Sequence, residues 1–473
     1  MIIGEKRIEK DSLGKLEIPS NAYYGIHSLR SLNNFPISEE KTNPQFIKAY
    51  LQVKLAAVNA NVNAGLISKD KSEMIVRAIE DLLDETENAI GGKSISIYEK
   101  VIVDPYQGGA GTSLNLNINE VIANKALELA GKNFGDYDFI HPIDDVNLSQ
   151  STNDTYITAL KIASINVLRK LTESFALLQG KLQEKEKDFS GIIKLGRTQL
   201  QDAVPVLLGQ EFGAYAQAIA RDRWRLYNAE ERLRSVNLGG TAIGNSISAD
   251  RKYVLNVNNE LKKITGLPLA KAEDLIDTTQ NLDVFVEVHG LVKAGACSVI
   301  KICNDLRLLS SGPQGGIGEI TLPPMQAGSS IMPGKVNPVI PESVIQICEL
   351  VKGHDVVISN IASAGNLELN AFSPLLAHLF LKSMKMLNDS LIILAEKCVK
   401  GIKANEKRCR ENLVRSSAIA ALLINEFGYD KIAELVKEAA EENEAFVNVI
   451  KRNKLLSEDK INKLISDSMG IIN

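Results

Sequence analysis

The stretch GSSIMPGKVNP at residues 328–338 places two serines, a lysine and an asparagine among two glycines and two prolines. Glycine and proline prevent such a stretch from continuing a helix. The residues on either side, 277–309 and 342–358, have helical patterns. A polar, glycine-rich loop between long helices is a common place for function. This loop is therefore the first candidate for a site.

Three other loops combine hydroxyl and amide side chains where helical patterns break. They are GTS at 111–113, SQSTND at 149–154 and GRTQLQD at 196–202. Each lies at or beside the end of a predicted long helix, where free backbone N–H groups and the helix dipole favour anions. A single Ser-Thr-Asn-Asp stretch before a helix is more often a cap than a binding site. Four such loops on one helical scaffold indicate a shared site.

Several other kinds of site do not fit the sequence. The first loop has five residues between its glycines, where a phosphate-binding P-loop has four, and Val336 stands where a magnesium-binding Ser or Thr would be. The five histidines have no metal-ligand spacing, and no GxSxG motif occurs. The remaining inventory is hydroxyls, amides and Lys335. It suits a small dianionic substrate, and carbanion chemistry next to a carboxylate, because preorganised donors stabilise the added charge.

The composition is that of an ordinary soluble protein of 473 residues with a net charge of −4, which gives no sign of nucleic-acid binding. Five cysteines without a CxxC pair argue against a disulfide framework. The N-terminus is charged where a signal peptide would be apolar, and no run of about 18 apolar residues occurs. We therefore expect no membrane contact and a cytoplasmic location.

Long amphipathic patterns dominate the middle of the chain. Predicted helices cover 156–187, 205–236 and 277–309, and apolar residues from Leu168 to Leu182 repeat at alternating spacings of three and four. Little of the chain has a strand pattern. Residues 294–300 carry no charge, so we expect other subunits to cover them. The helix predicted from Thr112 begins with an unusual number of asparagines: Asn115, Asn117 and Asn119.

The four loops resemble, in the same order, the conserved segments of the fumarase/aspartase superfamily of lyases, and 328–338 resembles its signature loop. The resemblance covers essentially the whole chain. It implies an all-α fold in three domains (1–148, 149–400 and 401–473), with five long central helices per subunit. It also implies a homotetramer with a core of about twenty helices, whose active sites are each built by three subunits. Segments 22–30 and 338–342 resemble the aspartate ammonia-lyases most.

The resemblance also implies a role for each matching residue. Ser329 would be the base that removes the Cβ proton of L-aspartate. The other implied roles are to hold the β-carboxylate (Thr112, Ser151, Thr152 and Ser330), to hold the α-carboxylate (Lys335, Asn337 and Thr198) and to face the amine (Asn153 and Gln199). No cofactor is required on this reading, and activation by Mg²⁺ is left open.

Gln199 stands where fumarases usually carry histidine. An amide cannot protonate a leaving hydroxide, whereas ammonia leaves from an –NH3⁺ group without a proton donor, so Gln199 favours deamination. His141-Pro142 looks more like the fumarase version of its segment and keeps fumarate hydratase open as the alternative. A catalytically inactive binding or structural member of the superfamily is a third reading, which the intact set of Ser329, Lys335 and Asn337 disfavours.

Overall fold

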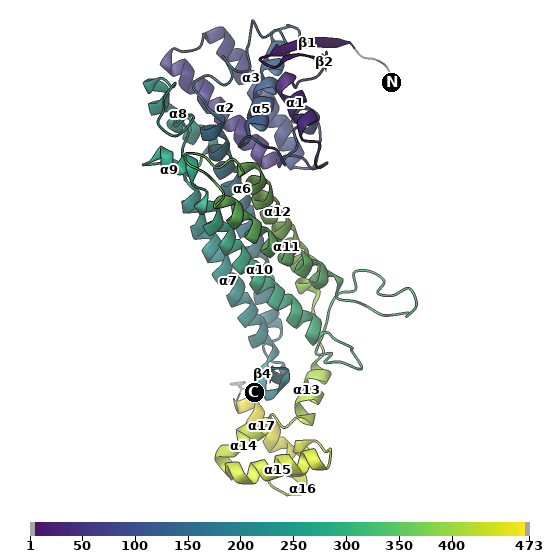
Figure 1. Ribbon diagram of the computed structural model, residues 1–473. Helices are drawn as coiled ribbons and strands as arrows, with labels where there is room; N and C mark the ends of the chain where they lie inside the picture. The colour runs from purple at the N-terminus through teal and green to yellow at the C-terminus, as the bar shows by residue number, and fades with distance from the viewer. Residues whose placement is uncertain (1–4, 469–473) are drawn as a thin grey trace. The chain divides into compact units, whose positions relative to one another are not determined.

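The computed structural model describes residues 5–468 and confirms the predicted all-α class (Figure 1). The helices are α1 (Ile26–Asn34), α2 (Pro44–Ala64), α3 (Lys69–Ile90), α4 (Ile97–Lys100), α5 (Thr112–Leu129), α6 (Thr152–Asp188), α7 (Leu208–Leu233), α8 (Arg251–Thr265), α9 (Leu275–Gln280), α10 (Asp283–Leu309), α11 (Val339–Ala362), α12 (Ser373–Lys397), α13 (Glu406–Arg415), α14 (Ala420–Phe427), α15 (Tyr429–Glu441), α16 (Phe446–Arg452) and α17 (Glu458–Ser468). A 3-10 turn, η1 (Val399–Gly401), precedes α13.

The strands form small two-stranded ribbons. They pair as β1 (Lys6–Asp11) with β2 (Gly14–Pro19), β3 (Ile193–Thr198) with β4 (Gln201–Leu207), β5 (Ser235–Val236) with β6 (Ala270–Lys271), and β7 (Ile320–Thr321) with β8 (Lys403–Ala404). The β5–β6 pair is parallel and the other three are antiparallel. No helix within residues 5–468 combines the length and the hydropathy that crossing a membrane would require.

The chain divides into two compact units. Unit 1 comprises Met1–Leu171, Arg225–Lys293 and Leu350–Met386, and unit 2 comprises Thr172–Trp224, Ala294–Glu349 and Leu387–Asn473. The five long helices α6, α7, α10, α11 and α12 each contribute residues to both units. The division of the sequence into three consecutive domains stays a prediction.

In unit 1, helix α2 packs against α3 and α8, and α3 packs against α5. Asn43 caps α2 by accepting a hydrogen bond from the Gln45 N–H, and Gly65 ends the helix in the left-handed region at a φ of 76°. The segments of the long helices in this unit are joined by buried polar and aromatic contacts. His289 of α10 contacts Asp355 of α11 at 2.9 Å, and the rings of Phe285 and Phe380 pack edge to face.

Two of the predicted long helices differ at their starts. The helix predicted from residue 205 begins at Leu208, because residues 201–207 form strand β4. The helix predicted from residue 277 is interrupted, since Asp274 caps the short helix α9 and α10 starts only at Asp283. Both differences come from local pairing or capping that the apolar pattern does not reveal.

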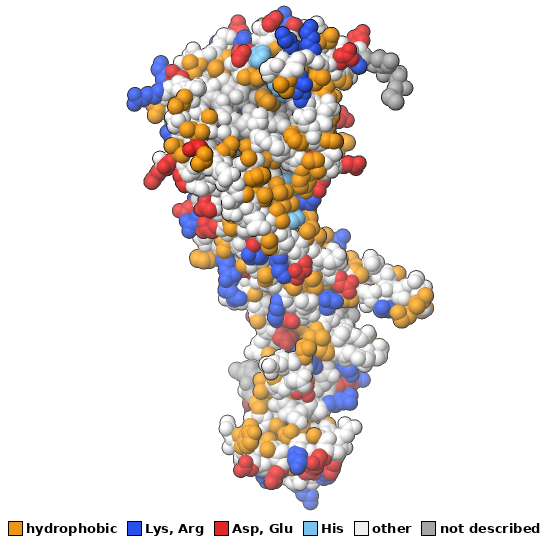
Figure 2. Space-filling view, viewed as in Figure 1, with side chains coloured by type: hydrophobic (Ala, Val, Ile, Leu, Met, Phe, Trp, Pro, Cys, Tyr) orange, Lys and Arg blue, Asp and Glu red, His pale blue; other side chains and the backbone are white. Residues whose placement is uncertain are grey.

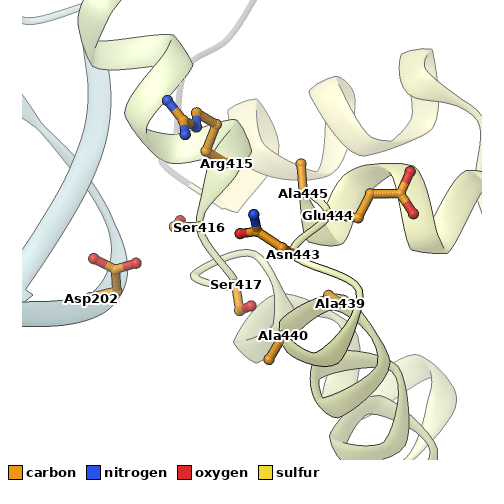
Figure 3. A pocket seen from close by; sticks show the side chains of 9 residues that line it. All are labelled: Asp202, Arg415, Ser416, Ser417, Ala439, Ala440, Asn443, Glu444 and Ala445. Atoms are coloured by element: carbon orange, nitrogen blue, oxygen red, sulfur yellow. The ribbon is translucent and has the colours of Figure 1, made fainter.

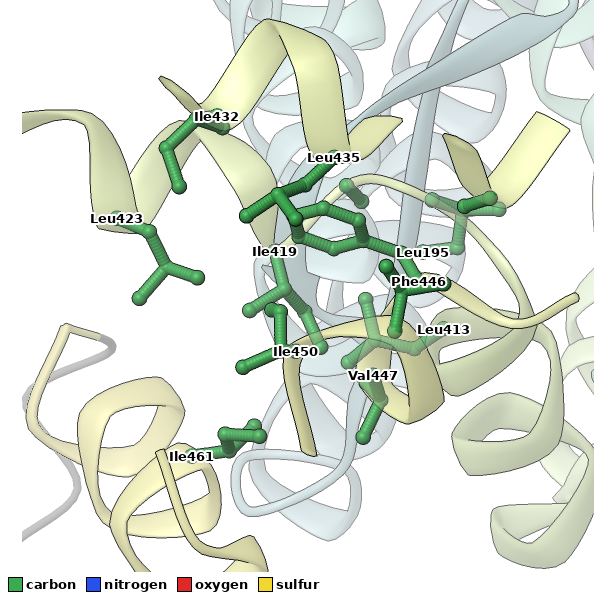
Figure 4. Close-up of a cluster of buried hydrophobic side chains, with 13 residues drawn as sticks. Leu195, Leu413, Ile419, Leu423, Ile432, Leu435, Phe446, Val447, Ile450 and Ile461 are labelled. Atoms are coloured by element: carbon green, nitrogen blue, oxygen red, sulfur yellow. The ribbon is translucent and has the colours of Figure 1, made fainter. Parts of the chain in front are cut away.

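In unit 2, the C-terminal helices α13 to α17 enclose an apolar cluster (Figure 4). Its members include Ile419, Leu423, Phe446 and Ile450, all of which are fully buried. Leu195 of strand β3 belongs to the same cluster, so the C-terminal helices hold the β3–β4 hairpin by apolar packing. On the face that Figure 2 shows, side chains of both charges are interspersed along both units.

Candidate active site

Thr112 is the first residue of α5, and Gly111 before it adopts a φ of 91°. A Cβ on Gly111 would lie 2.1 Å from Cδ2 of the Tyr156 ring, so only glycine fits this position. The Thr112 hydroxyl donates to the Gly109 carbonyl at 2.7 Å. The turn before α5 therefore presents an exposed Thr112 side chain in a fixed position.

The buried carboxylate of Asp154 organises the start of α6. It accepts hydrogen bonds from the backbone N–H groups of Ser151, Gly239 and Thr241 at 3.0, 3.1 and 3.0 Å. Burial raises the pKa of Asp154 to about 6, and the three N–H groups act in the opposite direction. Asp154 thereby joins residues 151–153 to the Gly239–Thr241 turn.

Three predicted site residues lie in this segment. The Ser151 hydroxyl accepts a hydrogen bond from the Asn153 N–H at 3.2 Å and can still donate its own proton. The Asn153 side chain donates to the Ala242 carbonyl at 2.7 Å. The Thr152 hydroxyl accepts from Nδ2 of Asn115 at 3.1 Å. Since Asn115 lies in the first turn of α5, this bond ties the Thr112 helix to the Thr152 helix.

Asn115 belongs to a buried polar network around Lys54 of α2. Nζ of Lys54 donates to Oδ1 of Asn115 at 2.7 Å, to Oδ1 of Asn147 at 3.0 Å and to Oε1 of Gln150 at 3.0 Å. Burial lowers the pKa of Lys54 to about 7, opposed by the charge of Asp154. A side-chain hydrogen bond thus ties Thr152 to this network, while Thr112 lies on the same helix as Asn115, and Ser151 and Asn153 flank Thr152 in the sequence.

In unit 2, Thr198 and Gln199 lie at the tip of the β3–β4 hairpin. The register pairs Thr198 with Gln201, and Gln199 and Leu200 have φ values of 54° and 63°, so they form a tight two-residue turn. Both Thr198 and Gln199 are exposed in this chain. The sequence pattern indicated only a break between helices here, and the hairpin was missed.

The signature loop is closed at its base by two hydrogen bonds. The Gly328 N–H donates to the Lys335 carbonyl at 3.0 Å, and the Asn337 side chain donates to the Gly328 carbonyl at 2.6 Å. A Cβ on Gly328 would lie 2.1 Å from the Lys335 carbonyl oxygen, which excludes any other residue. In Figure 1 the loop extends away from the helices of unit 2. Ser330 and Lys335 are exposed on it.

The Ser329 hydroxyl accepts two backbone hydrogen bonds inside this loop. The Ile331 N–H lies 3.2 Å from its oxygen and the Met332 N–H lies 3.0 Å from it. Two donors that point at the oxygen stabilise negative charge on it, and so favour the alkoxide over the neutral hydroxyl. This is the kind of support that a serine acting as a base requires.

Glu319 joins the hairpin to the segment that precedes the signature loop. Its fully buried carboxylate accepts a bidentate pair from Arg197 of β3 at 2.9 and 3.0 Å, and lies 3.0 Å from Nζ of Lys194 on the same strand. Asn412 of α13 donates to it at 3.0 Å. Burial works to raise the pKa of Glu319, but the contacts of Arg197, Lys194 and Asn412 outweigh it and hold the pKa below the ordinary value.

The predicted residues thus fall into three groups along the chain: residues 112 and 151–153 in unit 1, and the hairpin tip and the signature loop in unit 2. Sequence reasoning missed Lys54, Asp154 and Glu319 as supports of these groups. The asparagine-rich start of α5 was the one available signal for the Lys54 network. His141, which looks like the fumarase version of its segment, accepts hydrogen bonds at Nδ1 from the Ile143 and Asp144 N–H groups at 3.2 and 3.1 Å, as a turn-stabilising side chain does.

A hollow of about 280 Å³ lies in unit 2 between the hairpin and the C-terminal helices. Its lining includes Asp202, Arg415, Ser417 and Asn443 (Figure 3), and none of the predicted site residues. Within residues 5–468, no group of three or more His, Cys, Asp or Glu side chains is arranged to hold a metal ion.

The helical bundle and the polar loops are features of a class of helical lyases, and comparison with known proteins agrees. A family model described as "Lyase" matches residues 14–353. The chain belongs to this lyase family, which confirms the resemblance read from its loops.

Similar proteins match almost the whole chain. An aspartate ammonia-lyase of a Bacillus species is 43% identical over 460 residues, which are 97% of this chain and 96% of that protein. An aspartate ammonia-lyase of Helicobacter pylori is 45% identical, with the same coverage of 97% and 96%. Among solved structures, a Brucella melitensis fumarate lyase:delta crystallin bound to cobalt has a TM-score of 0.92 at 42% identity, covering 99% of this chain and 100% of that one. A class II fumarase of Schistosoma mansoni has a TM-score of 0.88 at 30% identity, with 98% of each chain covered.

Proposed function

We propose that this protein is an aspartate ammonia-lyase, a carbon–nitrogen lyase that reversibly converts L-aspartate to fumarate and ammonia. The observation that carries the proposal is the Ser329 hydroxyl, whose oxygen accepts two backbone N–H groups inside the signature loop. The aspartate ammonia-lyases that are 43–45% identical over 97% of the chain support it.

The first step is removal of a proton from Cβ of L-aspartate by Ser329. The Cβ–H bond breaks, an O–H bond forms on Ser329, and the electron pair moves into the β-carboxylate, which becomes a doubly charged aci form. Donors that bind this form more tightly than the ground state lower the barrier. We assign this role to the hydroxyls of Thr112, Ser151, Thr152 and Ser330.

The second step expels ammonia. The electron pair returns to form the Cα–Cβ double bond, the Cα–N bond breaks, and ammonia leaves as a neutral molecule. Lys335, Asn337 and Thr198 hold the α-carboxylate, while Asn153 and Gln199 face the amine. The neutral amide of Gln199 is sufficient because an –NH3⁺ group needs no proton donor when it leaves.

The signature loop acts as a lid in this proposal. Glycines and prolines within it suit a segment that closes over bound substrate. Asn337 donates one amide hydrogen to the Gly328 carbonyl in the present structure, and its second N–H can donate to the substrate carboxylate on closure. Closure would also exclude water from Ser329, which strengthens every electrostatic contact inside the site.

We further propose a homotetramer whose active sites each draw loops from three subunits. Large apolar side chains are exposed on the long helices of this single chain, among them Trp224 at 68% and Val356 at 60%. The uncharged stretch 294–300 also exposes Cys297. Exposed apolar surface of this kind marks an association face. We place the enzyme in the cytoplasm, without a required cofactor; activation by Mg²⁺ is tested by assays with EDTA and with added Mg²⁺.

The test is to mix the pure protein with L-aspartate or with L-malate and to follow fumarate by its ultraviolet absorbance. Fumarate from L-aspartate alone supports the proposal. Fumarate from L-malate alone would replace it with fumarate hydratase, the alternative supported by the fold match to a class II fumarase. Fumarate from neither substrate would favour an inactive member of the family.

Ser329→Ala tests the base. Turnover of L-aspartate should be lost while the oligomer and the helix content stay unchanged. Ser363→Ala is the matched control, because this exposed serine donates to the Asn360 carbonyl at the end of α11 and lies outside the proposed site. Near-normal turnover in Ser329→Ala would refute the assignment.

A further inference from the structure

Lys54 is a fully buried lysine that makes no hydrogen bond to a carboxylate among residues 5–468. All three of its hydrogen bonds go to side-chain amide oxygens, those of Asn115, Asn147 and Gln150. Burying an ammonium is costly, and an apolar side chain of similar volume would give a fold of equal or greater stability. Stability alone therefore does not account for a lysine at this position.

The lysine fixes the direction of the amides around it. In its charged form Lys54 donates and cannot accept, so each neighbouring amide turns its oxygen toward Nζ. With Oδ1 of Asn115 held at 2.7 Å from Lys54, its Nδ2 group points the other way. It donates there to Oδ1 of Asn147 and to the Thr152 hydroxyl oxygen, each at 3.1 Å.

The consequence reaches the hydroxyl proton of Thr152. Because the Thr152 oxygen accepts from Asn115, its own proton must point elsewhere. Within residues 5–468, the Thr152 hydroxyl donates to no other group. Lys54 also orients Asn147 and Gln150. Asn147 donates to the Gln150 carbonyl, and Gln150 donates to the Leu148 carbonyl, so the segment before Ser151 depends on the same lysine.

We propose that Lys54 and Asn115 are positioning residues, which keep the Thr152 hydroxyl oriented to donate its proton to the β-carboxylate of the substrate. This inference rests on the proposed function, in which Thr152 binds that carboxylate. The hydrogen bond from Thr152 strengthens as charge builds up in the aci form. Losing its direction therefore lowers kcat more than it raises KM.

Asn115→Asp separates this role from a structural one. The new carboxylate has the same shape and pairs with Lys54, so the fold should be kept. However, a carboxylate can only accept hydrogen bonds, so the Thr152 hydroxyl must now donate its proton to that carboxylate. The proton is then no longer available to the substrate. Loss of one such donor lowers kcat by roughly 10²–10³-fold. We expect that fall in Asn115→Asp, with an unchanged helix content and a KM within about threefold of the native value.

Further variants and a control complete the experiment. In a Thr152→Val background the donor is already absent, so adding Asn115→Asp should change kcat little. Lys54→Met removes the group that fixes the amides and should lower kcat in the same way, whether or not Asn115→Asp folds. Lys161→Met is the matched control: this lysine of α6 is also buried, but it donates to the Ser235 carbonyl and contacts none of the proposed site residues.

The inference is overturned if Asn115→Asp folds and keeps native kcat. It is also overturned if Asn115→Asp lowers kcat just as much in the Thr152→Val background. A third refuting outcome is a loss of kcat in Lys161→Met that equals the loss in Lys54→Met. Failure of the proposed function gives a different result, since the native enzyme itself would then make no fumarate from L-aspartate. If it made fumarate from L-malate, the same variants would be compared on L-malate, which carries the same β-carboxylate. Inactivity on both substrates would refute both proposals.

Discussion

Replacing Glu319 by glutamine removes the charge that two buried cations share. Lys194 has a side-chain exposure of 1% and Arg197 of 17%, so neither can recover full hydration when the carboxylate is lost. Removing one partner of a buried ion pair costs about 3–5 kcal/mol. Lys194 keeps its contact with Glu211 at 2.7 Å, and the amide oxygen can still accept from Arg197 or Asn412. We therefore expect a loss of about 3 kcal/mol, at the lower end of that range.

The assay is urea unfolding at pH 7, followed by circular dichroism at one fixed protein concentration. Glu396→Gln is the matched control, because Glu396 pairs with Lys400 at the surface of the same unit, and its replacement should leave the midpoint unchanged. Glu319→Gln should also lower kcat, since Glu319 joins the hairpin that carries Gln199 to the segment that precedes the signature loop.

The pH dependence gives a second readout. The contacts of Glu319 hold its folded pKa below the ordinary value of 4.5, so its contribution to stability is complete above that value and is lost as the pH falls through the lowered pKa. The difference in unfolding free energy between native protein and Glu319→Gln should therefore shrink on acidification. A variant as stable as the native protein at pH 7, or a difference that grows in acid, would refute the account of the Glu319 cluster.

Three other changes have expected outcomes. Burial lowers the folded pKa of Lys54 from 10.5 to about 7, so the unfolded chain binds more protons than the folded chain between these values. From about pH 7 to pH 10, the unfolding free energy of native protein should therefore rise by about 1.4 kcal/mol per pH unit relative to that of Lys54→Met. Urea unfolding measures this difference, and a difference that does not change with pH would contradict the burial effect. Gly111→Ala should lower the unfolding free energy by about 2–4 kcal/mol and reduce turnover, because the new Cβ overlaps the Tyr156 ring. Gly131→Ala is the control: Gly131 has a φ of 69° and open space around it, so this change should cost only about 1 kcal/mol. Equal losses in the two variants would show that the Tyr156 ring does not matter. Phe446→Ala in the C-terminal cluster should lower the unfolding free energy by about 3–5 kcal/mol. In hydrogen exchange, the amides of the C-terminal helices should lose protection first, and a uniform loss of protection along the chain would argue against a separate cluster.

The long helices and the polar loops could be predicted because both depend on local sequence. Apolar residues at spacings of three and four indicate a bundle wherever they fall, and glycine or proline ends a helix for reasons within the residue itself. Gly328 and Gly111 could be recognised as breaks for the same reason. The close contacts that require glycine there, with the Lys335 carbonyl and the Tyr156 ring, appear only in the folded chain.

The parts that were missed depend on contacts between distant segments. The β3–β4 hairpin contains Gly196 and Pro205, which obscure its strand pattern, and it is held by residues more than two hundred positions later in the C-terminal cluster. Lys54 lies in an alanine-rich helical pattern where a lysine normally marks the exposed face. Its buried partners, Asn115, Asn147 and Gln150, lie more than sixty positions later in the chain, which no local pattern encodes.

The contacts between α13 and the segment before the signature loop also bear on how the chain becomes active during synthesis. Arg408 donates to the Gly316 carbonyl across 92 positions, and Asn412 donates to the Ile317 carbonyl across 95. At about 5–20 residues per second, a ribosome needs about 5–20 s to make the intervening chain. The segment before the signature loop therefore cannot make these contacts until translation is almost finished. A nascent chain that stops short of α13 should be helical but inactive.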